Sequence, residues 1–104
     1  MIYEIIIIFK KNLSNNKNIV LDKIISDIGK KKILRTRNIE NINIKYPIKK
    51  QRIVDFFFIF CKRERRAKEI LEKRLKFNND ALRYIIINVP NKDYNLYLEN
   101  DLPK

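Results

Sequence analysis

The 104-residue chain has no histidine, no tryptophan, one glycine and one cysteine. Without histidine, and with Cys61 as the only thiol, it lacks a ligand set at zinc-binding spacing and cannot form an internal disulfide. A single glycine excludes the glycine-rich loops that cradle nucleotide phosphates. The acids Asp55, Glu64 and Asp80 show no pairing typical of general acid and base catalysis. These shortages argue against an enzyme and against a bound cofactor.

Long apolar segments are also missing. The longest runs are residues 5–9 and 56–61, far short of the roughly 20 residues that a membrane-spanning helix needs. Near the N-terminus Glu4 precedes the apolar run and positive charge follows it, which is the reverse of a secretory signal. We therefore expect a soluble, non-exported, cytoplasmic protein.

Positive charge is what the chain has in excess, with 24 Lys and Arg against 12 Asp and Glu. Residues 30–52 carry nine basic groups against Glu40 alone, and residues 62–76 carry eight against three acids. Such clustered charge repels itself, so it usually has a polyanionic partner, and we expect a nucleic acid. The alternative is compositional, because the many Ile, Lys and Asn residues are typical of an AT-rich bacterial or organellar genome.

The hydrophobic periodicity predicts a single domain over residues 1–89. The predicted strands span residues 2–10, 31–48, 53–61 and 82–89, and the predicted helices span 18–29 and 63–75. Gly29 suits a left-handed end of the first helix. The apolar positions of the second strand change parity near Asn41, which requires a bulge. Residues 90–104 have little periodicity and are expected to form an extended or disordered tail.

The order β-α-β-β-α-β predicts an α+β, ferredoxin-like fold. Two helices would cover one face of a four-stranded antiparallel sheet, with the first and third strands central. The segment DFFFIF at residues 55–60 places large apolar groups on both faces of the third strand. Whichever face the helices cover, the other therefore keeps an apolar patch, which marks an interaction site.

An RNA-recognition motif has this same topology and stacks bases on strand aromatics. Its third-strand signature contains glycine, whereas DFFFIF has Asp55 and no glycine. A single-stranded RNA-binding module that uses these rings is thus the alternative function, and a protein interface is the preferred one. A small-ligand regulatory module of this fold would require a polar pocket and would not predict a charge of +12.

Three stretches carry a family resemblance: YE at residues 3–4, YPIKK at 46–50 and LKFNNDALRYIIINV at 75–89. In this order and spacing, over residues 2–89, the chain resembles the bacterial small-subunit ribosomal protein six family. The resemblance implies a structural protein that binds the central domain of small-subunit rRNA together with small-subunit ribosomal protein eighteen. One departure is the segment IENINIK at residues 39–45, where the family has a glycine and paired arginines.

The candidate contacts fall into two sets, with the basic groups expected outside the apolar sheet surface. The candidate rRNA contacts are Arg35, Arg37, Lys45, Lys49, Lys50, Arg52 and Arg83. The candidate protein contacts are Tyr3, Tyr46, Phe56, Phe58, Phe60, Tyr94 and Tyr97. The plain alternatives are solvated charge for the first set and core packing for the second. For Arg83 the alternative is an ion pair with Asp80.

Overall fold

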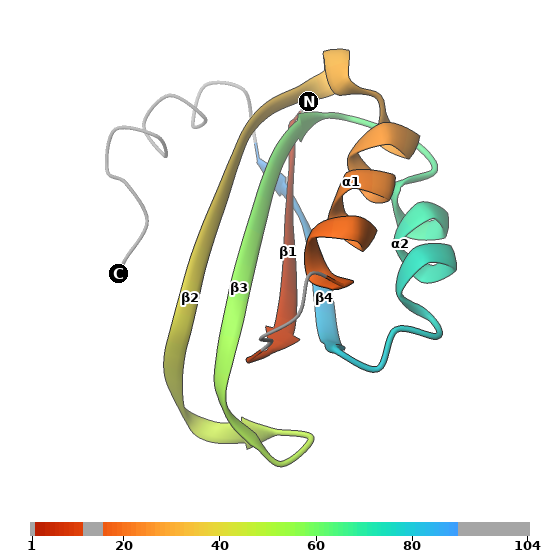
Figure 1. Cartoon of the computed structure of the whole chain (residues 1–104). Coiled ribbons are helices and arrows are strands. Elements are labelled where there is room, and N and C mark those ends of the chain that lie inside the picture. Colours follow the sequence, from red (N-terminus) through yellow and green to blue (C-terminus); the bar gives the residue numbers. More distant parts are fainter. Residues whose placement is uncertain (1, 12–15, 90–104) are drawn as a thin grey trace.

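The computed structural model describes residues 2–11 and 16–89 (Figure 1). Along the chain, the elements are β1 (Ile2–Lys10), α1 (Asn16–Ile28), the 3-10 turn η1 (Lys30–Lys32), β2 (Ile33–Ile48), β3 (Gln51–Lys62), α2 (Ala67–Leu75) and β4 (Ala81–Val89). The sheet order is β2-β3-β1-β4, and all neighbouring strands are antiparallel. The predicted ferredoxin-like α+β fold, with the first and third strands central, is confirmed. The expected tail, residues 90–104, lies outside the described residues.

The core lies between the sheet and the two helices, which cover the same face (Figure 1). β1 and β3 supply odd-numbered residues, including Ile5, Ile7, Phe9, Ile59 and Cys61. The helices supply their apolar stripes: Val20, Leu21, Ile24 and Ile28 from α1, and Ala67, Ile70, Leu71 and Leu75 from α2. Burying each large side chain stabilises the fold by about 1.5–3 kcal/mol. Among the described residues, no helix is long and apolar enough to cross a membrane.

Two backbone predictions are confirmed. Gly29 directly follows α1 with a φ of 106°, and its N–H donates to the Ile25 carbonyl oxygen at 2.9 Å. Asn41 has a φ of 58°, and the β2–β3 register shifts between Ile39 and Ile42. The predicted start of the second helix at residue 63 is wrong, because β3 continues to Lys62 and α2 begins only at Ala67.

Candidate functional site

The sheet face opposite the helices, here called the open face, is built in rows across the strands. Directly opposed residues of antiparallel strands point to the same face. From β2 through β3 to β1, the rows are Ile39, Phe56 and Ile8; Arg37, Phe58 and Ile6; and Arg35, Phe60 and Glu4. The even-numbered phenylalanines of β3 therefore form the middle of the open face, which the sequence left undecided.

The three phenylalanines are not equally accessible. Phe58 and Phe60 are only 8% and 1% exposed, whereas Phe56 is half-buried and meets Phe58 edge-on at a centroid distance of 6.1 Å. Ile85 and Ile87 of β4 extend the same rows and are exposed. Base stacking needs an open ring face, and Phe58 and Phe60 do not offer one. The same burial leaves these two predicted partner contacts little surface for a protein either, so the accessible apolar groups of the open face are Phe56, Ile85 and Ile87.

The apolar surface continues toward the β2–β3 turn. There, Ile8, Val54 and Leu82 form a second buried cluster, separate from the core under the helices. The partly buried residues packed against it are Ile6, Ile42, Ile44, Ile48 and Phe56. The open face is consequently apolar from the middle of the sheet to the hairpin end.

Four predicted residues lie in places that the sequence did not indicate. Tyr3 is opposite Cys61, so it packs half-buried on the helix-covered face and cannot join an interface on the open face. Arg35 and Arg37 lie on the open face beside Phe60 and Phe58. Arg83 of β4 is opposite Ile8 and lies on this face too. The expectation that the basic groups lie outside the apolar surface is therefore wrong for these three arginines. For Arg35 and Arg37 the cause is the register of β2 before its bulge.

The turn between β2 and β3 consists of Lys49 and Lys50, flanked by the paired residues Ile48 and Gln51. Both lysines have positive φ, 47° and 70°. A two-residue hairpin loop with two positive φ angles is the type I′ pattern, which favours Asn-Gly. Each non-glycine residue in this conformation costs about 1–2 kcal/mol. Two exposed lysines are thus held at the tip of the hairpin despite a local strain.

Lys45, Tyr46 and Arg52 flank this turn and are all exposed. The Lys45 Nζ lies 5.7 Å from the centroid of the Tyr46 ring, a cation–π arrangement. The hairpin end therefore combines positive charge with an accessible ring. Tyr94 and Tyr97, the remaining predicted contacts, lie outside the described residues.

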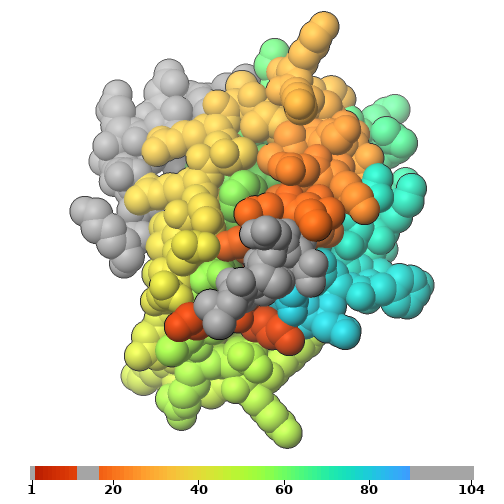
Figure 2. All heavy atoms as spheres, in the orientation of Figure 1, coloured from red at the N-terminus to blue at the C-terminus, as the bar shows by residue number. Residues whose placement is uncertain are grey.

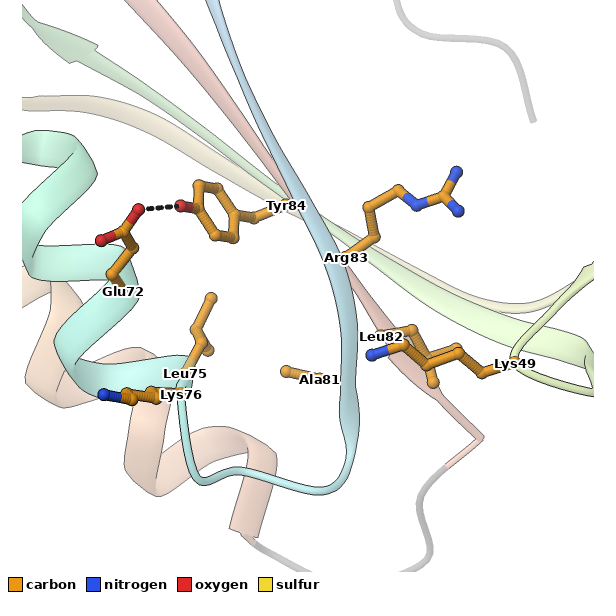
Figure 3. Close-up of a pocket in the computed structure, with 8 residues that line it drawn as sticks. All are labelled: Lys49, Glu72, Leu75, Lys76, Ala81, Leu82, Arg83 and Tyr84. Carbon is orange, nitrogen blue, oxygen red and sulfur yellow. Dashed lines mark hydrogen bonds between the residues drawn. The ribbon is translucent and has the colours of Figure 1, made fainter.

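Arg83 and Lys49 line one hollow of about 520 Å³ beside the start of β4 (Figure 3). In this view both side chains lie on one side of β4, and Lys76 lies on the other side with Glu72 and Tyr84. Asp80, the alternative partner of Arg83, forms an ion pair with Lys10 at 3.3 Å. The structure thus joins two predicted cations from distant elements and adds Lys76, which the sequence analysis missed.

Tyr84 closes the helix side of this hollow. Its hydroxyl donates a hydrogen bond to the Glu72 Oε1 at 3.2 Å. Burial and the nearby Glu72 carboxylate raise the pKa of Tyr84, so the phenol stays protonated and keeps its role as a donor.

A buried charge cluster lies at the bulge of β2 and was also missed. The Lys17 Nζ is 3.4 Å from the Asp55 Oδ2 and 2.9 Å from the Glu40 Oε2. The backbone N–H of Asn41 donates to the Asp55 Oδ1 at 3.0 Å. The cluster joins the first turn of α1 to the β2–β3 hairpin, since Lys17 is 23 residues from Glu40 and 38 residues from Asp55 in the sequence.

Comparisons with known proteins agree with this architecture. A model of the family described as Ribosomal protein S6 matches residues 2–88. A search of curated proteins found no match. Among solved structures, the crystal structure of 30S ribosomal protein S6 from Thermotoga maritima is similar, with a TM-score of 0.70 and 20% identity. The alignment covers 96% of this chain and 97% of that one, and at this identity it shows the fold.

Proposed function

Because the chain belongs to the ribosomal protein S6 family, and is thus a structural component of the small ribosomal subunit, we propose that it binds the central domain of small-subunit rRNA together with small-subunit ribosomal protein eighteen. The cations at the hairpin end would neutralise rRNA phosphates. The open face would hold protein eighteen. The proposed role is assembly, in a cytoplasmic bacterial ribosome or, as the alternative, in an organellar one.

The observation that carries the rRNA part is the strained turn of Lys49 and Lys50. A sequence selected for stability alone would favour Asn-Gly at these two positions. Strain kept at an exposed, charged tip supports a role in binding. Arg83 shares a hollow with Lys49, so a single backbone segment of RNA can reach both cations.

The protein-eighteen part rests on the open face. Phe56, Ile85 and Ile87 are at least partly accessible there, and Arg35 and Arg37 lie along the β2 side of the same rows. An apolar centre with arginine beside it is the usual composition of a protein interface. The arginines can then reach either acidic groups of the partner or phosphates at the edge of the joint surface.

The test is binding of the purified chain to a central-domain rRNA fragment, with and without protein eighteen, across a salt series. An unstructured RNA of equal length is the control. We expect tight binding only to the folded fragment and only with the partner, weakening steeply as salt rises because counterions are released on binding. Equal binding of both RNAs by the chain alone would contradict the proposal.

A further inference from the structure

Phe77, in the turn after α2, is 86% exposed and contributes little to either apolar cluster. The turn that carries it is well hydrogen-bonded. The N–H of Asn78 donates to the Leu75 carbonyl oxygen at 3.0 Å, and the N–H of Asp80 donates to the Asn78 Oδ1 at 2.9 Å. The N–H of Lys10 donates to the Asp80 carbonyl oxygen at 2.9 Å, which ties the turn to β1. The ring is therefore presented to solvent by a fixed backbone.

The segment after α2, cyan in Figure 2, projects at the flank of the molecule beside α1. Phe77 and Asn78 separate two hollows there, of about 330 and 410 Å³. One hollow extends to Ile19 of α1, which is also exposed, and the other extends to Lys10 and Asn79.

The charges around the ring are almost all positive. The side chains that line the two hollows include Lys10, Lys23, Lys73 and Arg74, and among the described lining residues the only carboxylate is Asp80. The Lys76 Nζ lies 5.4 Å from the centroid of the Phe77 ring. Asp80 pairs with Lys10, and Arg74 pairs with Asp27. Within the described residues, no ion pair holds Lys23, Lys73 or Lys76.

We propose that Phe77 is a stacking platform for an unpaired base of single-stranded RNA, with Lys23, Lys73 and Lys76 binding the flanking phosphates. A ring between two hollows can accept a base, and cations on both sides match a backbone that continues past it. The amide of Asn79 is available to the base edge. An apolar protein surface would leave three lysines without partners, so charge favours RNA.

This Phe77 platform is separate from the apolar rows of the open face, because its larger cation set comes from α1 and the end of α2, and none of its lining residues belongs to those rows. It rests on the proposed function only for the source of the RNA, an unpaired segment of small-subunit rRNA. The platform itself predicts binding by the chain alone to any unpaired strand. It can therefore be tested without rRNA and without protein eighteen.

The experiment is an NMR titration of the ¹⁵N-labelled full chain with a single-stranded uridine dodecamer. A fully paired RNA duplex of the same length is the control. We expect the largest amide shifts in residues 76–80 and 19–23, with weaker effects from the duplex because it offers no free base. Phe77→Ala should weaken binding about 5- to 150-fold, the usual effect of removing one base–aromatic stack. Phe77→Tyr should restore it.

Leu34→Ala is the matched control, because Leu34 of β2 is also an exposed apolar side chain, at 39%, and lines neither hollow beside Phe77. It should change dodecamer affinity by less than about twofold. Failure of the dodecamer to bind, or shifts centred on the open face, would overturn the platform. So would equal losses in the Phe77→Ala and Leu34→Ala variants. Failure of rRNA binding with protein eighteen would instead count against the proposed function alone.

Discussion

Replacing Lys17 by methionine should destabilise the domain strongly. The ammonium group of Lys17 contacts two carboxylates in different surroundings. The side chain of Glu40 is 54% exposed, whereas that of Asp55 is only 3% exposed. The shorter contact, to Glu40 at 2.9 Å, is therefore the weaker one, since exposed ion pairs contribute about 0–1 kcal/mol. The contact to Asp55 decides the outcome, because its loss leaves a buried carboxylate without a counter-ion.

Removing one partner of a buried ion pair costs about 3–5 kcal/mol. The Asn41 N–H still donates to Asp55 after the substitution, so we expect the lower end of that range. Methionine keeps the aliphatic stem of lysine, so the packing of α1 changes little. For a domain with about 5–15 kcal/mol of stability, the loss should lower the urea midpoint by roughly 1–3 M. Circular dichroism during urea unfolding at pH 7 measures it.

Two further variants separate the buried pair from the exposed one. Glu40→Gln should cost no more than about 1 kcal/mol. The double variant Lys17→Met with Asp55→Asn should be more stable than the sum of its single changes, since it leaves no buried charge unpaired. If Glu40→Gln cost as much as Lys17→Met, or if the two single losses simply added, the reasoning would be refuted.

Three other predictions concern the turn, the carboxylates and the thiol. The double variant Lys49→Asn/Lys50→Gly should raise the free energy of unfolding by about 1–2 kcal/mol, because it relieves two positive φ angles. In rRNA titrations the same double variant should reduce the salt dependence of the binding constant by about two phosphate contacts. Lower stability with an unchanged salt dependence would count against Lys49 and Lys50 as phosphate contacts. Hydrogen bonds from Arg74, Lys17 and Lys32 hold the pKa values of Asp27, Glu40 and Glu64 below their ordinary values of 3.8, 4.5 and 4.5. The stabilisation of the fold by these three carboxylates is thus complete above about pH 4.5 and is lost as the pH falls through their lowered pKa values. A urea midpoint that stays unchanged between pH 6 and 2.5 would disprove this contribution. Burial, and then the charge of Glu64, raise the pKa of the Cys61 thiol from 9.0 to about 11. The thiol should therefore resist a disulfide reagent at pH 8 until urea unfolds the chain, and rapid labelling of the native protein would contradict its burial. The free energy of unfolding should also fall as the pH rises from 9 towards 11.

The order and type of the elements could be predicted because they depend on local patterns. Period-two and 3.6-residue rhythms give the four strands and two helices, and Gly29 and the parity change at Asn41 mark their irregular points. The face covered by the helices could not be predicted, because both parities of β1 and β3 are largely apolar. Each parity also carries one acid, Glu4 on the open face and Asp55 on the covered face. Charge alone therefore did not distinguish them.

The site could be predicted only where its residues are close in sequence. The basic turn at Lys49 and Lys50 is visible in the sequence, although its strain is not. The Phe77 platform depends on Lys23 of α1 lying beside Lys73 of α2. No local pattern brings these segments together, and an isolated phenylalanine in a turn is as consistent with core packing as with exposure.

The bulge at Asn41 connects the buried charge cluster to the composition of the open face. Ile39 and Ile42 have opposite parity, so a regular strand would turn one of them away from the open face. Glu40 and Asn41 together oppose the single residue Asp55, and this extra residue returns Ile42 to the same face as Ile39. Asp55 fixes that geometry by accepting the Asn41 N–H, and Lys17 neutralises Asp55.

A charge cluster on the helix side therefore determines which side chains a partner meets on the opposite side of the sheet. Without Lys17 the Asn41–Asp55 hydrogen bond alone holds the bulge, so Ile42 and the residues after it are held less firmly in register with Val54. Binding of a protein to the open face should then weaken in Lys17→Met even where the domain remains folded. It should not weaken in Glu40→Gln, because that variant keeps both the Asn41–Asp55 hydrogen bond and the buried ion pair. Stacking at Phe77 should be unaffected by either change, since that turn is held to β1 through Asp80 and Lys10.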